Sequence, residues 1–362
     1  MLKTLDRYII KKFLSTFFFT ALIFTLISVV IDYSEKVNKF IESEITKREI
    51  VLGYFPNFIV FIDGLLWPLF TLIAVIFFTS RMAYNSEIIS ILNAGVSFRR
   101  LMRPYLLTAV FIAVLHLIGN HYYIPKGNKI RLDIEHKYFS HDNDKGRTTD
   151  VHMFVAPNTK VYINRFNKRD STVRNFRLER FDSNQLVYLL KATSAEFLGP
   201  PDKWRLRNYE IRTFNGSSES LTIGRGQQID TTINLLPEDF VDFIEQQSMM
   251  TTAQLKAYIH KQRTRGVGNL EKYLVELYRR SAEPFTILIL TVIGVAVAAR
   301  KVRGGMGLHL AIGISIGALY IFMSRFAIVF ANGQAIPPIV GIWLPNIIFT
   351  FVAALLVVRA QK

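Results

Sequence analysis

The 362-residue sequence contains no Cys, and its acidic residues are scarce beside the basic ones. Without Cys the chain can form no disulfide and offers no thiol nucleophile and no Cys-ligated zinc or iron–sulfur site. Lys and Arg number 44 against 28 Asp and Glu, so the formal net charge is +16. Cytoplasmic loops of membrane proteins, anionic lipid headgroups and nucleic acid each account for such a charge. Because 50% of the residues are hydrophobic, we favour the membrane and expect no nucleic-acid partner.

Motifs for nucleotide binding and catalysis are also missing. A Walker loop requires Gly-x-x-x-x-Gly-Lys-Ser/Thr, and the Gly cluster at residues 304–307 lacks the Lys-Ser/Thr ending. The seven His are scattered, and solvated or core histidines explain them better than metal ligands do. No Asp or Glu pair fits a recognisable acid–base pattern. We therefore expect no enzyme activity, metal or cofactor in this chain, and its energy source would be a partner.

Long stretches nearly free of charge dominate the sequence. They cover residues 13–31, 55–79, 104–125, 284–299 and 304–358. About 20 apolar residues cross a bilayer as one helix, so the last stretch is too long for a single span. The turn signal at residues 331–334, followed by Pro337 and Pro338, divides it in two. The sequence thus predicts six transmembrane helices.

The charges that flank these stretches predict their orientation. Lys and Arg are concentrated before residue 13, in 80–103, in 300–303 and after 358, whereas the 32–54 connection is mixed in charge. Since Lys and Arg are retained on the cytoplasmic side, we expect both termini to be cytoplasmic. The first apolar stretch is longer than a signal-peptide core and lacks a small-x-small cleavage pattern, so we interpret it as a retained helix.

Residues 126–282 form a polar insertion between the third and fourth spans. Short runs rich in Val, Ile, Tyr and Phe predict strands at 151–156, 160–166, 173–181, 186–198, 203–214, 220–223 and 227–235. Seven short strands at this spacing suggest a sandwich or jelly roll. The expected fold is a polytopic α-helical membrane protein with six transmembrane helices and an inserted β-jellyroll-like domain. Its expected divisions are residues 1–125 (spans one to three), 126–250 (the β domain), 251–282 (a helical connector) and 283–362 (spans four to six).

The loop at about residues 85–95 predicts a short amphipathic helix. Asn85 or Ser86 can cap it, Glu87 suits the positive end of the helix dipole, and Gly95 suits its C-terminal end. Its apolar stripe consists of Ile88, Ile91 and Leu92. Such a helix either docks in a groove of a cytoplasmic partner or lies on the membrane surface, and its residues favour neither.

Four charged residues at membrane depth are candidate substrate contacts. Lys36 and Lys39 follow the first span, where cations bind anionic groups or extend to ordinary lipid headgroups. Asp63 lies in the outer half of the second span and Arg325 near the outer end of the fifth. Ionisable groups inside spans usually face a cavity or a partner charge. Asp63 and Arg325 have the charges to pair, but the sequence does not place them side by side.

Three motifs together resemble the lipopolysaccharide-transport permease family (LptF/LptG type). They are the opening Leu5-Asp6-Arg7-Tyr8-Ile9, the 86–95 loop, and Ile336-Pro337-Pro338-Ile339-Val340-Gly341 followed by Leu344-Pro345. The first and last are closer to the LptG side, and the resemblance covers nearly the whole chain. It implies a multi-pass inner-membrane permease subunit of an ABC-type transporter, which extracts lipopolysaccharide and passes it to a periplasmic bridge protein towards the outer membrane. The implied partners are a second permease of the family and a dimeric cytoplasmic ATPase.

The resemblance also implies roles for particular residues. Glu87 falls on the acidic residue of the coupling helix that docks on the ATPase, with Ile88, Ile91, Leu92 and Gly95 in the same helix. Spans one and five would border a lateral opening, with Lys36, Lys39 and Arg325 near the anionic head of the lipid. No residue of the β domain is carried over, because that region matches only in pattern.

Two other functions compete with lipopolysaccharide export. An ABC-type permease that releases lipoproteins has a similar build but typically four spans. A membrane-anchored assembly or sensor protein would transport nothing and would need no ATPase.

Overall fold

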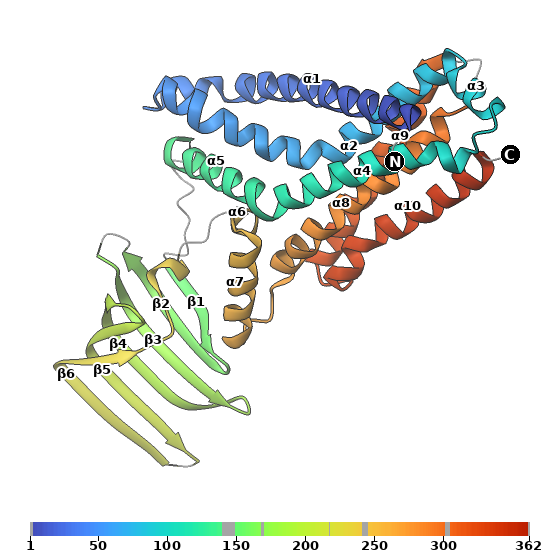
Figure 1. Ribbon diagram of the computed structural model, residues 1–362. Coiled ribbons are helices and arrows are strands. Elements are labelled where there is room, and N and C mark those ends of the chain that lie inside the picture. Colours follow the sequence, from blue (N-terminus) through green and yellow to red (C-terminus); the bar gives the residue numbers. More distant parts are fainter. Residues whose placement is uncertain are drawn as a thin grey trace. The chain divides into compact units, whose positions relative to one another are not determined.

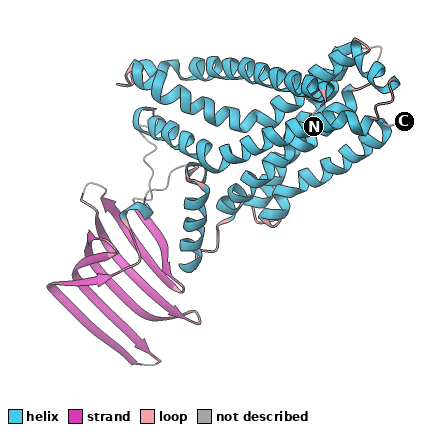
Figure 2. Ribbon diagram, in the orientation of Figure 1, coloured by secondary structure: helices cyan, strands magenta, loops and turns pink. Residues whose placement is uncertain are grey.

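The computed structural model describes residues 3–139, 149–167, 170–216, 218–240, 245–300 and 305–360. The chain divides into two compact units (Figure 1). The helical unit comprises residues 1–139, 247–255 and 271–362, and the sheet unit comprises residues 140–246 and 256–270. Figure 2 shows that the strands lie in the second of these units.

The helical unit contains the expected membrane spans. Its helices are α1 (Thr4–Glu42), α2 (Phe55–Tyr84), α3 (Glu87–Asn93), α4 (Phe98–Ile118), α5 (Ile124–Phe139), α8 (Glu271–Ala298), α9 (Gly305–Asn332) and α10 (Pro338–Ala360), with π-helical turns η1 (Glu49–Tyr54) and η2 (Gly119–Tyr123). Six helical stretches among the described residues are long and apolar enough to cross a membrane. The prediction of a polytopic helical protein with six spans is confirmed.

Small residues allow the spans to approach one another closely. A Cβ added at Gly313 of α9 would lie 2.0 Å from Ile76 of α2, and one at Gly294 of α8 would lie 2.9 Å from Val75. Without side chains at these two glycines, α2 packs directly against the backbones of α8 and α9. Close backbone approach at small residues is a common source of helix association in membranes.

The third span is longer than its apolar stretch predicts. Helical structure continues from Phe98 to Phe139 through α4, η2 and α5. Pro125 follows the π-helical turn η2 closely, so the hydrogen-bonding pattern already changes where proline supplies no N–H, and the helical stretch continues past it. The expected division between residues 125 and 126 therefore falls inside a helical stretch, and the units separate between residues 139 and 140.

The sheet unit contains one antiparallel sheet of six described strands in chain order. The strands are β1 (Thr149–Ala156), β2 (Thr159–Asn167), β3 (Thr172–Asp182), β4 (Gln185–Gly199), β5 (Lys203–Asn215) and β6 (Ser218–Thr232). The inserted β domain is confirmed, but the expectation of seven strands is wrong, because residues 220–223 and 227–232 belong to a single strand. Gly224 pairs with Tyr209, whose ring fills the space of the missing side chain, and β6 continues past Gly224 and Gly226.

One face of the sheet is covered by the segment that follows β6. The indole nitrogen of Trp204, which is completely buried, donates a hydrogen bond of 2.9 Å to the carbonyl oxygen of Leu235. Phe240, at the end of the short helix η3 (Pro237–Phe240), stacks on Phe166 with ring centroids 4.2 Å apart. Leu235 and Phe240 are themselves fully buried, so this segment completes the core of the sheet unit.

Helix α7 (Thr252–Thr264) is anchored to the same segment at its C-terminal end. Arg265 has a side chain that is only 1% exposed, and it donates hydrogen bonds of 2.7 Å to the carbonyl oxygen of Asn234 and to Asp239. Lys261 forms a second ion pair with Asp239 at 3.1 Å. The first turn of α7 belongs to the helical unit and the remainder to the sheet unit, so the predicted 251–282 connector is divided between the two.

Candidate functional site

Helix α3 occupies the loop for which the sequence predicts a short helix. Gly95 has a φ of +83°, a conformation that glycine adopts without a steric penalty. The N–H of Gly95 binds the carbonyl of Leu92 at 3.0 Å, and the N–H of Val96 binds that of Ile91 at 3.4 Å. This pair of bonds is a Schellman motif, which ends the helix after two turns. Figure 1 shows α3 and both chain termini at one end of the helical unit, called here the terminal end.

The apolar residues of α3 divide between its own bundle and its outer face. Ile88 is completely buried in the same core cluster as Ile9 and Phe98, and Ile91 packs against that cluster. Ile89 is 41% exposed and Leu92 is 37% exposed. Ile88 and Ile91 therefore hold α3 on the membrane helices, while Ile89 and Leu92 are free to meet another molecule. Sequence reasoning missed Ile89, because in so short a helix the apolar residues at 88, 89, 91 and 92 extend around more than one face.

Glu87, at the first turn of α3, is half-buried and bound by a residue of α1. The hydroxyl of Tyr8 donates a hydrogen bond of 3.0 Å to Glu87 Oε2, and the amide of Asn85 lies 3.5 Å from Glu87 Oε1. Beyond α3, Arg100 binds both carboxylate oxygens of Asp6 at 2.7 and 2.8 Å. Asp6 and Tyr8 belong to the opening motif of the chain, but the motif alone did not indicate these contacts.

Lys36 is not free to bind a ligand in this conformation. Its ammonium group contacts Asp32 at 2.6 Å and Glu135 at 2.9 Å, and it is hydrogen-bonded to the hydroxyl of Tyr54. Arg131 forms a further ion pair with Glu135 at 3.2 Å. Two cations and two carboxylates balance one another, and the Lys36 side chain is only 18% exposed. This cluster joins α1, η1 and α5.

The other three predicted substrate contacts lie apart from this cluster. Lys39 is exposed, and its side chain makes no hydrogen bond or ion pair with any residue that the structure describes. Asp63 of α2 accepts a hydrogen bond of 2.6 Å from the hydroxyl of Thr25 of α1. Arg325 is exposed on α9. The structure therefore brings Asp63 to Thr25 rather than pairing it with Arg325.

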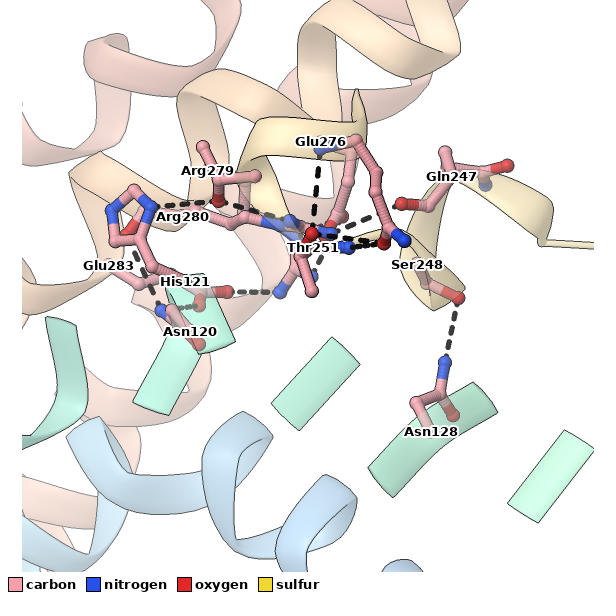
Figure 3. Close-up of polar contacts among 12 residues, drawn as sticks. Asn120, His121, Asn128, Gln247, Ser248, Thr251, Glu276, Arg279, Arg280 and Glu283 are labelled. Atoms are coloured by element: carbon pink, nitrogen blue, oxygen red, sulfur yellow. Dashed lines mark hydrogen bonds and ion pairs between the residues drawn. The ribbon is translucent and has the colours of Figure 1, made fainter. Parts of the chain in front are cut away.

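A buried polar cluster, here called the polar junction, lies where α6 and the start of α7 meet α8, at the end of the helical unit away from α3, called here the insertion end (Figure 1). Figure 3 shows its contacts. Arg280 of α8 is 1% exposed and donates to Glu276 at 2.8 Å. It also donates to the hydroxyl of Thr252 at 3.2 Å and to the carbonyl of Gln247 at 3.1 Å. Gln247 belongs to α6 (Gln246–Met249), so Arg280 fixes α6 and the start of α7 to α8.

The polar junction also includes the third span. Asn120 of η2 donates to Glu283 at 3.0 Å, and His121 is hydrogen-bonded to the hydroxyl of Thr252 at 2.8 Å. Arg279 forms ion pairs with Glu276 at 2.8 Å and Glu283 at 2.5 Å. The junction is thus made of Asn120, His121, Gln247, Thr252, Glu276, Arg279, Arg280 and Glu283. The i,i+4 spacing of Glu276 with Arg280 and of Arg279 with Glu283 was the signal available in the sequence.

The part of the chain that the structure describes contains no group of three or more His, Asp or Glu residues placed to hold a metal ion. The features that the described residues do present are apolar surfaces, ion pairs and a short exposed helix.

Comparisons with known proteins agree over almost the whole chain. The sequence profile of the family described as lipopolysaccharide export system permease LptF/LptG matches residues 7–359. The chain is 21% identical over 359 residues to the lipopolysaccharide export system permease protein LptG of Haemophilus influenzae, with 96% of each chain covered. It is 19% identical over 360 residues to the protein of the same name in Escherichia coli K12, with 98% of each covered.

Proposed function

The chain belongs to the lipopolysaccharide export system permease LptF/LptG family, and we propose that it exports lipopolysaccharide as an inner-membrane permease subunit. The observation that carries this proposal is the family match over residues 7–359, together with six spans and an inserted sheet. Lifting a lipid from a bilayer costs about 0.8 kcal/mol for each methylene exposed to water. Several acyl chains thus require tens of kcal/mol, and a cytoplasmic ATPase dimer supplies this energy in steps.

The ATPase docks on α3, at the terminal end. The Lys- and Arg-rich flanks of the spans support a cytoplasmic location for this end. Glu87 and Leu92, joined by the exposed Ile89, make the contact with the ATPase. Ile88, Ile91 and Gly95 shape α3 and hold it on the bundle, so they act on docking through the position of the helix.

A second permease of the family pairs with this chain along α1 and α9. The most apolar window of each of these helices is only 17% buried, whereas the next least buried span, α10, is 33% buried. Their uncovered faces carry large apolar side chains, among them Phe18, Leu22, Phe322 and Phe326. Between two such subunits these faces border a lateral opening that is apolar enough to admit acyl chains.

The anionic head of the lipid meets Lys39 and Arg325, which are exposed next to these faces in α1 and α9. Lys36 joins them only after its ion pairs with Asp32 and Glu135 have opened. Asp63 acts indirectly, because its hydrogen bond to Thr25 sets the position of α1 against α2. The sheet unit then passes the lipid to a periplasmic bridge protein.

Purification of the tagged chain in mild detergent tests this function. We expect a cytoplasmic ATPase, a second permease and bound lipopolysaccharide to be recovered with it. The Glu87→Lys variant should lose the ATPase and retain the second permease. Recovery of lipoprotein in place of lipopolysaccharide would favour the lipoprotein-release alternative, which the six spans already disfavour. Recovery without any ATPase would favour a non-transporting assembly or sensor protein.

A further inference from the structure

The first two turns of α1 contact the segment that contains α3 at two separate points. At the first turn of α3, the Tyr8 hydroxyl donates a hydrogen bond of 3.0 Å to Glu87. After α3 ends, Arg100 binds the Asp6 carboxylate through two hydrogen bonds of 2.7 and 2.8 Å. Asp6 is 3% exposed and also accepts a hydrogen bond of 2.9 Å from the backbone N–H of Lys3. Two-point, charge-assisted pairs of this kind are stronger and more directional than single neutral hydrogen bonds.

Apolar packing connects the same two segments. Ile9 and Phe13 of α1 are completely buried and belong to the core cluster that contains Ile88 and Phe98. The α1 side chains between residues 6 and 13 therefore alternate between polar contacts with the ends of the α3 segment and apolar contacts with its buried face. Close-packed protein interiors transmit strain, so fully buried side chains of this kind can carry a displacement from one segment to the other.

We propose that residues 6–13 and 85–100 move as one body, with the Tyr8 hydroxyl linking Glu87 to α1, so that displacement of α3 is carried directly into α1. This inference rests on the proposed function. Tyr8 binds only Oε2 of Glu87, so a cation of the ATPase can still bind Oε1, which lies 3.5 Å from the amide of Asn85, and docking does not depend on the Tyr8 hydroxyl. The apolar window of α1 is only 17% buried, so most of its surface lies outside the core of this chain. The helix that borders the lateral opening is therefore the one attached to the docking element.

The Tyr8→Phe variant isolates this contact, because it removes one oxygen atom and leaves the ring in place. In the purified complex reconstituted in vesicles that contain lipopolysaccharide, the co-purifying ATPase should be recovered in wild-type amounts. Lipopolysaccharide released per ATP hydrolysed should fall by roughly three- to tenfold, as expected for loss of an exposed hydrogen bond of ordinary strength. Asp6→Asn, which weakens the second contact, should lower the same ratio.

Tyr33→Phe is the matched control. Tyr33 is also on α1 and is 49% exposed, and its hydroxyl makes no hydrogen bond with the residues that the structure describes. Its ratio of release to hydrolysis should equal that of the wild type. An unchanged ratio in both Tyr8→Phe and Asp6→Asn would overturn the inference, as would a loss of export that merely follows a loss of bound ATPase. If no ATPase is recovered with the wild-type chain, the proposed function itself fails. That result differs from failure of this inference, in which the ATPase is recovered but the ratio does not change.

Discussion

The polar junction at the insertion end and helix α3 at the terminal end differ in what they leave exposed. At the insertion end, Arg280 and Glu276 are 1% and 8% exposed, and they are bonded to each other and to neighbouring elements. At the terminal end, α3 presents Ile89 and Leu92 outward and keeps only Ile88 fully buried. The polar junction is closed by contacts within the chain, whereas α3 leaves apolar side chains uncovered. We infer that the junction maintains the fold and that the exposed side of α3 is the one available to the proposed ATPase partner.

Arg280→Ala should have the largest effect on stability. It leaves the buried Glu276 carboxylate with Arg279 alone and removes the donor to Thr252 and to the Gln247 carbonyl, and we expect a cost of about 3 kcal/mol, the lower end of the range for breaking a buried pair. Thermal unfolding of the intact protein in detergent should show a clearly lower unfolding temperature for this variant. Arg99→Ala, at an exposed arginine of α4, should change the unfolding temperature little. Equal unfolding temperatures for the two variants would remove the proposed difference between the ends.

Asp239→Asn should destabilise the sheet unit in a pH-dependent manner. Burial raises the pKa of Asp239, but hydrogen bonds from Arg265 and the Leu236 N–H, and the charges of Arg265 and Lys261, outweigh it, so the pKa is lowered. A lowered folded-state pKa stabilises the fold above the unfolded pKa of about 4, and this contribution is lost as the pH falls through the folded value. The variant should therefore lose about 3 kcal/mol at neutral pH and approach the wild type in acid.

Hydrogen exchange of the β-strand amides in the intact protein measures this effect. Asp230→Asn is the control, since Asp230 also pairs with an arginine, Arg205, but at the surface, with side chains 53% and 36% exposed. Exposed pairs contribute little to stability. Faster exchange in Asp230→Asn than in Asp239→Asn would contradict the conclusion that the buried Arg265–Asp239 pair anchors α7.

Ile89→Ala and Leu92→Ala should weaken recovery of the ATPase while leaving the fold intact. Removal of a single apolar contact at an interface typically costs about 1–2 kcal/mol of binding. Quantification of the ATPase bound per permease, together with the unfolding temperature, checks both halves of this prediction. Ile88→Ala should instead lower the unfolding temperature, because the Ile88 side chain is fully buried. Normal stability for Ile88→Ala would show that α3 is not held as described.

Lys39→Gln should have the smallest effect on stability, within about 0.5 kcal/mol, because its side chain is exposed. It should nevertheless lower photocrosslinking of lipopolysaccharide to residues near the outer end of α1 during active export. Lys36→Gln should lower the unfolding temperature, since it leaves Asp32 and Glu135 short of a cation. If only Lys36→Gln lowers crosslinking, Lys36 rather than Lys39 meets the anionic head of the lipid.

Prediction from sequence succeeded where a signal was local and failed where two distant segments had to meet. The turn that divides α9 from α10 and the glycine that ends α3 were readable, because proline and glycine restrict the backbone at their own positions. The sequence did not show that the last two predicted strands form one strand. That outcome depends on the Tyr209 ring of the neighbouring strand, which fills the space beside Gly224. The ion pairs of Lys36 were equally hidden, as Glu135 is far away in the chain.

By itself the sequence determined that the chain crosses a membrane six times and carries a β insertion, because hydrophobic length and alternation are properties of consecutive residues. It also held the motifs that resemble the family. Only the tertiary structure decided which side of α3 faces outward, which lysine is already paired, and that α1 is bound to the α3 segment through Tyr8 and Asp6. Such outcomes depend on charges and surfaces from distant parts of the chain competing for the same space.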